Sequence, residues 1–360
     1  MALELNYSFQ DRLLHKMAFA SSFMQLAAAD MERTLFASAY EGATAARPIF
    51  ITSLPRAGTT LLLEALHLFP SLASHTYRDM PFVLAPIIWS RLSGSFRRPS
   101  EKRERAHRDG MEVGFDSPEA FEEILWRTFW PEKFRADGID LWHKPDQKAE
   151  AKTFFVEHMK KIVALRRPDR LRDGRYVSKN NGNIARLEFI GEMFPDAKIL
   201  LPVRRPIEHA RSLLRQHRNF LEMHKESSFV REYMGDIGHY EFGDLHRPIA
   251  FPGLSALVAN RDPLTLEYWL AYWIAAFEYV AGHKDKVILV SYEDSCANPQ
   301  RAVAEMCAKL EIADEGMLAT VAGMFKDAPA ADRKTEVDPS LRSRAEQLHD
   351  ALLDRVRHSA

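Results

Sequence analysis

Hydrophobic and polar residues along the chain follow two patterns, which together predict an α/β fold. Short apolar runs rich in β-branched residues are typical of strands buried on both faces of a sheet. Longer segments whose apolar residues recur every three or four positions are typical of helices. Strands are predicted at Pro48–Ser53, Arg175–Ser178, Lys198–Val203 and Val287–Ser291. Helical segments separate them, so we expect a three-layer, P-loop-like fold with a central parallel sheet flanked by helices.

The helical segments also carry recognisable signals at their ends. Helices are predicted at Thr59–Phe69, Ala149–Arg167, Asn183–Met193, Pro206–Met223, Leu264–Gly282 and Asp338–Ser359. In the last of these, Asp338 is the expected cap and a proline follows it in the first turn. Ser117 and Pro118 supply the N-cap and the first-position proline of a further predicted helix.

The chain is predicted to form one domain of residues 1–360 with two additions. Residues 1–45 should form an amphipathic N-terminal helix, which we expect to pack on the domain rather than on a membrane surface. An insertion at about residues 80–172 is expected to form a helical cap over the site. Its basic segment, 91–110, is predicted to be a solvated loop, with contact to an anionic acceptor as the alternative.

Composition narrows the class of protein only slightly. Of the 360 residues, 46% are hydrophobic, which is ample for a large core. The net charge of −1 gives no reason to expect a nucleic-acid partner, and no apolar run reaches the length of a membrane span. Cys296 and Cys307 can form neither a metal site nor a disulfide framework, so we expect a reducing, cytoplasmic setting. Homo-oligomer formation stays open.

The loop after the first strand has the position of a phosphate-binding loop. A Walker A loop has the pattern G-x-x-x-x-G-K-[ST], in which the lysine reaches the β and γ phosphates. Here the loop reads SLPRAGTT: Ser53 replaces the first glycine, Thr59 replaces the lysine, and Arg56 brings the positive charge into the loop. Arginine and the N-terminus of the following helix would form an anion site.

A second basic motif follows the strand at 198–203. In nucleotide kinases a nearby strand ends in an aspartate that helps to hold magnesium. This strand instead ends in Arg204 and Arg205, which would repel a metal ion and attract a phosphate. Ser212 lies about two helical turns beyond Arg204, where both could contact one phosphate. The two motifs predict a donor with separate anionic groups, bound without a metal.

The segments LPRAGTTLL and VRRPIEHARSLL resemble the two motifs that bind PAPS (3′-phosphoadenosine 5′-phosphosulfate) in the sulfotransferase superfamily. The form with an arginine in the first loop is similar to tyrosylprotein and many bacterial sulfotransferases. The resemblance covers about residues 49–215, with weaker support from VILVSYEDSCANP at 287–299. It implies that PAPS is the co-substrate and that PAP, the desulfated nucleotide, is the product.

The resemblance also implies which residues bind the donor. The implied contacts to the 5′-phosphosulfate come from Arg56, Ala57, Gly58, Thr59 and Thr60. Those to the 3′-phosphate come from Arg204, Ser212 and, in a poorly matched basic loop, Arg333 and Lys334. Ala57 stands where a serine is commoner, and little loss is expected because the backbone N–H groups act there.

A third segment, YVSKNNGNIARL, resembles a K-N-P-x-H-x-x-R-L motif of related enzymes. Lys179 matches its lysine and is a candidate for stabilising the transferring group; a solvated lysine at a strand end is the alternative. Asn181 replaces the proline of the motif and Asn183 replaces its histidine. This chain therefore lacks the histidine of the motif.

Sulfuryl transfer needs a base for the proton of the acceptor and cations for the leaving oxygen. Arg56 is the candidate for the cation. The resemblance points to the segment after the first motif for the base, where Asp79 ranks first and His75 second. An ion pair of Asp79 and a structural role of His75 are the alternatives. Further candidates lie in the cluster Asp116–Glu123 and in the turn His143–Asp146.

The predicted function is metal-free, in-line transfer of a sulfuryl group from PAPS to a hydroxyl or amine of a small-molecule or biopolymer acceptor. Two alternatives stay open: a P-loop kinase or NTPase that uses ATP, and a nucleotide-binding module that has lost its base. The acceptor itself is not indicated. Aromatic residues of the insertion have the helical spacing of ordinary core packing: Phe115, Phe121, Trp126, Phe129 and Trp130.

Overall fold

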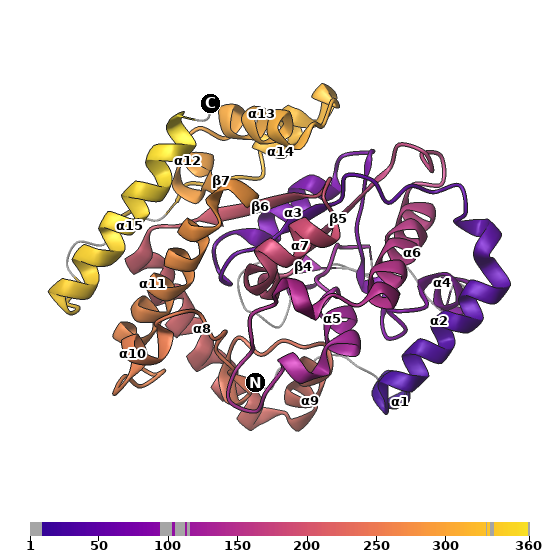
Figure 1. Ribbon diagram of the computed structural model, residues 1–360, viewed down its shortest axis with the longest axis horizontal. Helices are drawn as coiled ribbons and strands as arrows, with labels where there is room; N and C mark the ends of the chain where they lie inside the picture. Colours follow the sequence, from indigo (N-terminus) through magenta and orange to yellow (C-terminus); the bar gives the residue numbers. More distant parts are fainter. Residues whose placement is uncertain are drawn as a thin grey trace.

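A five-stranded parallel sheet lies at the centre of the computed structural model (Figure 1). The pairing of the strands gives the order β2-β5-β1-β6-β7. The structure describes residues 9–93, 103–104, 112–113, 116–328, 330–331 and 335–358. The strands are β1 (Ile49–Ile51), β2 (Leu72–Ala73), β5 (Arg175–Lys179), β6 (Lys198–Val203) and β7 (Ile288–Ser291). The four predicted strands are confirmed. The fifth, β2, is only two residues long, too short to show a periodic pattern.

The two faces of the sheet bury different side chains, because successive residues of a strand point to opposite sides. Ile49 and Ile51 of β1 belong to one core, and Phe50 between them belongs to the other. The first core is shared with α3 (Thr59–His67), α13 (Pro299–Leu310) and α14 (Leu318–Ala322). The second is shared with α6 (Ala149–Arg166), α7 (Leu187–Met193), α8 (Pro206–Glu226), α11 (Leu266–Gly282) and α15 (Pro339–His358). The predicted three-layer α/β fold is confirmed.

The middle position of β1 determines where the site forms. Ile51, at the end of β1, is in register with Lys179 of β5 on one side and with Leu200 of β6 on the other. In a parallel sheet the carboxyl ends of neighbouring strands meet at one edge. The loop after β1 therefore begins beside the ends of β5 and β6, which carry Lys179 and Arg204.

The insertion between β2 and β5 is mainly helical. Its elements are α4 (Pro86–Ser93), the antiparallel pair β3 (Arg103–Glu104) and β4 (Glu112–Val113), α5 (Glu123–Phe129) and α6. The predicted helix start at Ser117 is wrong, since Pro118 forms an antiparallel bridge with Thr76. The Glu119 N–H donates to the His75 carbonyl (3.1 Å), which keeps this stretch extended. Most of the basic segment 91–110 lies outside the described residues.

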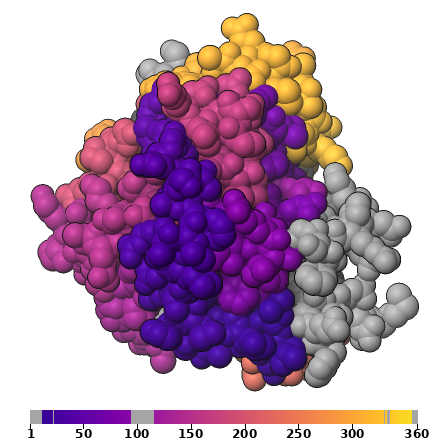
Figure 2. All heavy atoms as spheres, turned by 90° about the vertical axis from the view of Figure 1, so that its right-hand side faces the viewer, coloured from indigo at the N-terminus to yellow at the C-terminus, as the bar shows by residue number. Residues whose placement is uncertain are grey.

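The N-terminal region forms two helices where one was expected, α1 (Phe9–Phe19) and α2 (Ser22–Phe36). The Ser21 hydroxyl caps α2 by accepting a hydrogen bond from the Met24 N–H. α2 packs on the domain, where its buried Glu32 pairs with Lys161 of α6 at 3.1 Å. Figure 2 shows this indigo segment spread over one face of the molecule. None of the helices in the described ranges is long and apolar enough to cross a membrane.

The remaining α-helices lie after α8 along the chain. They are α9 (Ser228–Asp236), α10 (Leu254–Val258) and α12 (Tyr292–Ala297), the last beginning directly after β7. Short 3₁₀ segments lie at Ala37–Ala39, Tyr77–Asp79, Pro131–Lys133, Lys144–Asp146, Asn181–Arg186, Gly243–Leu245, Lys284–Lys286 and Glu315–Met317. The predicted cap of α15 is confirmed, because the Asp338 carboxylate accepts a hydrogen bond from the Ser340 N–H (2.8 Å).

Candidate functional site

The loop at residues 53–58 is held at three points by the elements that follow it. The Ser53 hydroxyl donates to the carbonyl of Pro202 in β6 (2.8 Å). Arg204, just beyond β6, donates from its guanidinium to the Arg56 carbonyl (2.9 Å). The Arg56 backbone has a positive φ of 72°, a conformation that costs a non-glycine residue about 1 kcal/mol or more. These bonds help to fix the loop in that conformation.

His209 of α8 supplies the third attachment. Its Nε2 lies 2.7 Å from the Pro55 carbonyl, and its Nδ1 accepts a hydrogen bond from the Trp273 indole at 3.2 Å. Because the indole can only donate, the hydrogen of neutral His209 sits on Nε2 and is donated to the loop. Burial and the neighbouring Arg204 guanidinium lower the pKa of His209 to about 3. The imidazole is therefore neutral near pH 7.

The loop leads into the N-terminus of α3, where backbone N–H groups have no partners within the helix. Gly58 caps the helix with φ of 95° and offers no side-chain hydrogen bond. A Cβ at this position would lie 2.9 Å from Cδ2 of Tyr292. Glycine is required here for both reasons, and it leaves the N–H groups of the first turn open to an anion.

Three cations surround the space in front of this helix: Arg56 from the loop, Lys179 from the end of β5 and Arg204 from the end of β6. We call this space the cationic pocket. The Arg204 guanidinium also lies 4.8 Å from the ring centre of Tyr292, the first residue after β7. The residues that line the cationic pocket are Pro55, Arg56, Gly58, Thr59, Thr60, Leu61, Glu119, Lys179, Asn181, Arg204, Phe220, His239, Glu241, Phe242 and Tyr292.

Most of the residues expected to bind the donor line this pocket, but Ser212 and Ala57 are buried behind it. The Ser212 hydroxyl accepts long hydrogen bonds from Arg56 Nε and from Arg215, both at 3.4 Å. It therefore contacts the arginine of the loop. Arg333 and Lys334 lie outside the described residues.

The two expected bases, Asp79 and His75, belong to a buried network. The Asp79 carboxylate accepts hydrogen bonds from Arg166, from the Thr76 N–H (3.0 Å) and from His75 Nδ1 (3.0 Å). His75 Nε2 lies 2.9 Å from Nε2 of His158. Burial alone would raise the pKa of Asp79, but the Arg166 charge and the His75 hydrogen bond outweigh it and hold the pKa well below its ordinary value.

This placement argues against either residue as the base. Asp79 and His75 are each only 2% exposed, and neither is among the described residues that line the cationic pocket. The 3₁₀ turn Tyr77–Asp79 directs the carboxylate inward onto α6, an orientation that residue counting from the first motif cannot reveal. No residue of the turn Lys144–Asp146 lines the pocket, and its Asp146 pairs with Lys133 at 2.7 Å.

Two carboxylates do line the pocket, Glu119 and Glu241. Glu119 belongs to the cluster at 116–123 that the sequence offered as a further candidate. Glu241 and its neighbour His239 were missed, because the stretch between α9 and α10 has no recognisable motif. Glu241 accepts a hydrogen bond from the Asn181 amide (3.3 Å), and the same Asn181 accepts one from the Thr59 hydroxyl (3.2 Å).

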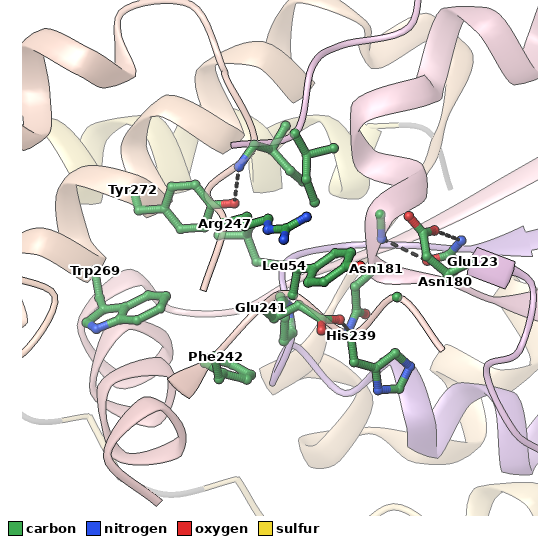
Figure 3. Close-up of a pocket in the computed structure, with 16 residues that line it drawn as sticks. Leu54, Glu123, Asn180, Asn181, His239, Glu241, Phe242, Arg247, Trp269 and Tyr272 are labelled. Atoms are coloured by element: carbon green, nitrogen blue, oxygen red, sulfur yellow. Dashed lines mark hydrogen bonds between the residues drawn. The ribbon is translucent and has the colours of Figure 1, made fainter. Parts of the chain in front are cut away.

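A second pocket adjoins the first and is mostly apolar (Figure 3). We call it the aromatic pocket, because Tyr240, Phe242, Trp269 and Tyr272 line it. Residues that line both pockets are Pro55, Asn181, His239, Glu241 and Phe242. The two pockets therefore meet at a junction that contains one carboxylate and one imidazole. Phe121, Trp126 and Trp130 are buried in the core and line neither pocket, as predicted.

The fold and the site together define an α/β protein with a cationic pocket at the carboxyl edge of a parallel sheet. A family profile described as the sulfotransferase family matches residues 48–316. The match spans well over half of the chain, and the protein belongs to the sulfotransferase family. No curated protein sequence matches it significantly.

Several solved bacterial sulfotransferases are similar to the chain over most of its length. For the enzyme of Mycobacterium avium the identity is 11% and the TM-score 0.48, over 98% of this chain and 87% of that one. For the enzyme of Mycobacterium tuberculosis the identity is 11% and the TM-score 0.44, over 98% of this chain and 88% of that one. For the enzyme of Alicyclobacillus acidocaldarius the identity is 15% and the TM-score 0.39, over 87% of this chain and 96% of that one.

Proposed function

We propose that the protein transfers a sulfuryl group from PAPS to a hydroxyl or amine of an acceptor. The observation that carries the proposal is the convergence of Arg56, Lys179 and Arg204 around the open N-terminus of α3. The donor has anionic groups at both its 5′ and 3′ ends, so it requires several separated cations. Guanidinium groups suit this task because they bind phosphate and sulfate oxygens through two parallel hydrogen bonds.

Each part of the cationic pocket then has a role. The N–H groups at the start of α3, with Thr59 and Thr60, bind the 5′-phosphosulfate. Arg56 and Lys179 stabilise the charge that develops on the leaving oxygen, and Arg204 binds the 3′-phosphate. Ser212 positions Arg56 through the hydrogen bond to its Nε.

We assign the base to Glu241, because it lies at the junction of the two pockets. An acceptor hydroxyl in the aromatic pocket would attack the sulfur while its proton passes to the Glu241 carboxylate. A new oxygen–sulfur bond forms, and the bond between sulfur and the 5′-phosphate oxygen breaks. The electron pair of that bond stays on the phosphate of PAP, which leaves. An amine acceptor would react in the same way through nitrogen.

Nucleotide binding separates this proposal from the two alternatives. The expected result is that PAP binds without magnesium and more tightly than ATP with magnesium, as measured by titration calorimetry with and without EDTA. Tighter binding of magnesium–ATP would favour a kinase or NTPase. Formation of PAP from PAPS in the presence of an acceptor panel would exclude a module without activity. A cytoplasmic location and self-association stay predictions from the sequence.

A further inference from the structure

A positively charged side chain, Arg247, lies among the aromatic and apolar residues of the aromatic pocket. The Arg247 guanidinium reaches into the pocket from the segment between α9 and α10 (Figure 3). It stacks on Tyr240 with 4.2 Å to the ring centre, and it makes no ion pair with any residue that the structure describes. A guanidinium among aromatic side chains loses hydration, and an anionic partner would compensate for that loss.

The segment that carries Arg247 is firmly held. The Arg247 N–H donates to the Tyr240 carbonyl at 2.8 Å. On its other side, Ile139 donates to the Pro248 carbonyl at 3.0 Å and accepts from the Ala250 N–H at 2.8 Å. These backbone hydrogen bonds fix the main chain that carries Arg247, and the stacking on Tyr240 orients its guanidinium at the pocket.

The other charged groups of the pocket do not supply the missing anion. Glu123 is already paired with the buried Arg186, at 2.7 Å. Glu241 accepts from Asn181 at the junction and is assigned to the acceptor proton. His246, next to Arg247, adds no second cation near pH 7, because burial and the nearby His217 lower its pKa to about 4. Arg247 is thus the permanent cation among the described residues that line the pocket.

Tyr272 can complete a site for a carboxylate beside Arg247. Its hydroxyl accepts a hydrogen bond from the Ile249 N–H (3.1 Å), which ties it to the segment that carries the arginine. Burial raises the pKa of Tyr272 well above its ordinary range, so the hydroxyl keeps its hydrogen and can donate it. Figure 3 shows Arg247 and Tyr272 both lining the pocket. A guanidinium and a hydroxyl donor together match the two oxygens of a carboxylate.

We propose that the acceptor is an aromatic hydroxy acid whose carboxylate pairs with Arg247 and whose hydroxyl lies beside Glu241. Trp269, Tyr240 and Phe242 supply flat apolar surfaces for its ring. The proposal rests on the proposed function, because it uses the junction as the place of sulfuryl transfer. The proposal excludes an acceptor that the pocket binds through apolar contacts alone.

The test compares two acceptors that differ in one group: para-hydroxyphenylacetate has a carboxylate, and para-hydroxyphenylacetamide has the neutral amide in its place. Binding of each is measured by calorimetry with PAP present, and sulfation of each is measured with PAPS. The acid is expected to bind at least about tenfold more tightly than the amide, since a charged hydrogen-bonded pair contributes about 1.5–3 kcal/mol. In Arg247→Met this preference should fall to near unity, whereas Arg247→Lys should keep part of it. Equal binding of acid and amide to the wild type would overturn the proposal.

Two controls distinguish failure of this inference from failure of the proposed function. PAP affinity is measured in every variant, and it should be unchanged in Arg247→Met because the residue does not line the cationic pocket. Arg231→Gln removes an exposed arginine of α9 and should leave the preference for the acid intact. If PAP binds but the acid and the amide bind alike, only the acceptor class is wrong. If PAP does not bind, the proposed function fails with it.

Discussion

The Arg204 guanidinium donates a hydrogen bond of 2.9 Å to the backbone carbonyl of Arg56. The two arginines therefore lie at the same pocket, and the second helps to hold the loop that carries the first. From the sequence they were expected to bind opposite ends of one donor as independent groups. The structure adds a coupling between them: loss of Arg204 removes a cation and also one of the attachments of the first loop.

This coupling predicts the effect of Arg204→Gln on donor binding. PAP affinity should fall on the order of 10- to 100-fold, because a charge-assisted hydrogen bond to an anion contributes about 1.5–3 kcal/mol. Titration calorimetry at constant salt measures the change. Arg301→Gln is the matched control, since Arg301 is an exposed arginine of α13 that pairs with Asp294. Equal losses in the two variants would mean that PAP responds only to overall charge.

Assignment of the base to Glu241 predicts that Glu241→Gln lowers kcat by about 10²-fold or more, the scale of general-base loss. PAP affinity should stay within a few-fold of the wild-type value, because the Glu241 carboxylate is not assigned to bind the nucleotide. Single-turnover sulfation of an accepted phenol measures the rate. Glu119→Gln is the companion variant, with the other carboxylate of the cationic pocket removed. We expect less than about a tenfold loss there, and the reverse ranking would move the base to Glu119.

How well the sequence predicted the site depends on whether a residue lies in a continuous motif. Arg56, Gly58 and Arg204 follow directly after predicted strands, so the parallel sheet fixes their meeting point before any side chain is placed. Glu241 and Arg247 reach the site through the packing of a connection between two helices. That packing leaves no periodic signal along the chain, and neither residue was expected.

The insertion shows the same limit for secondary structure. Ser117 and Pro118 have the composition of a helix start, and local propensity predicts one there. In the folded chain a bridge between Thr76 and Pro118 takes precedence, and α5 begins at Glu123. Local preference amounts to a few tenths to one kcal/mol, so tertiary hydrogen bonds can override it. The two-residue strand β2 could not be predicted for a related reason: it forms by pairing with β5, as Leu72 does with Arg175.

The buried position of Asp79 predicts a loss of stability rather than of chemistry in Asp79→Asn. The substitution leaves Arg166 without its carboxylate partner in a largely buried place, which costs about 3–5 kcal/mol of unfolding free energy. Urea unfolding measures this change, and sulfation per folded molecule should stay within a few-fold. Asp116→Asn is the control, because its ion pair with Arg78 is exposed and contributes about 1 kcal/mol or less. A 10²-fold loss of kcat in a stable Asp79→Asn protein would restore Asp79 as the base.

The neutral state of His209 predicts a dependence of stability on pH. Its pKa is about 3 in the folded protein and about 6.5 when exposed, so between these values only the unfolded chain binds the proton. The contribution of His209 to the unfolding free energy should therefore be fully present above pH 6.5. It should fall by up to about 1.4 kcal/mol for each pH unit below that, down to the folded pKa. His246 and His67, both lowered to about 4, add slopes of the same sign.

The contribution of His209 can be isolated by comparing the slopes of two variants between pH 6.5 and 5. His209→Gln removes the titrating ring, while the glutamine amide can still donate to the Pro55 carbonyl. The slope of unfolding free energy against pH should therefore fall by the amount that corresponds to about one bound proton. Thr153→Ser, which changes an exposed residue that has no titrating group, should leave the slope unchanged. Urea unfolding at several pH values gives the slopes directly. If His209→Gln keeps the wild-type slope, then His209 takes up its proton in the folded protein, and the neutral donor assigned to the loop cannot be correct.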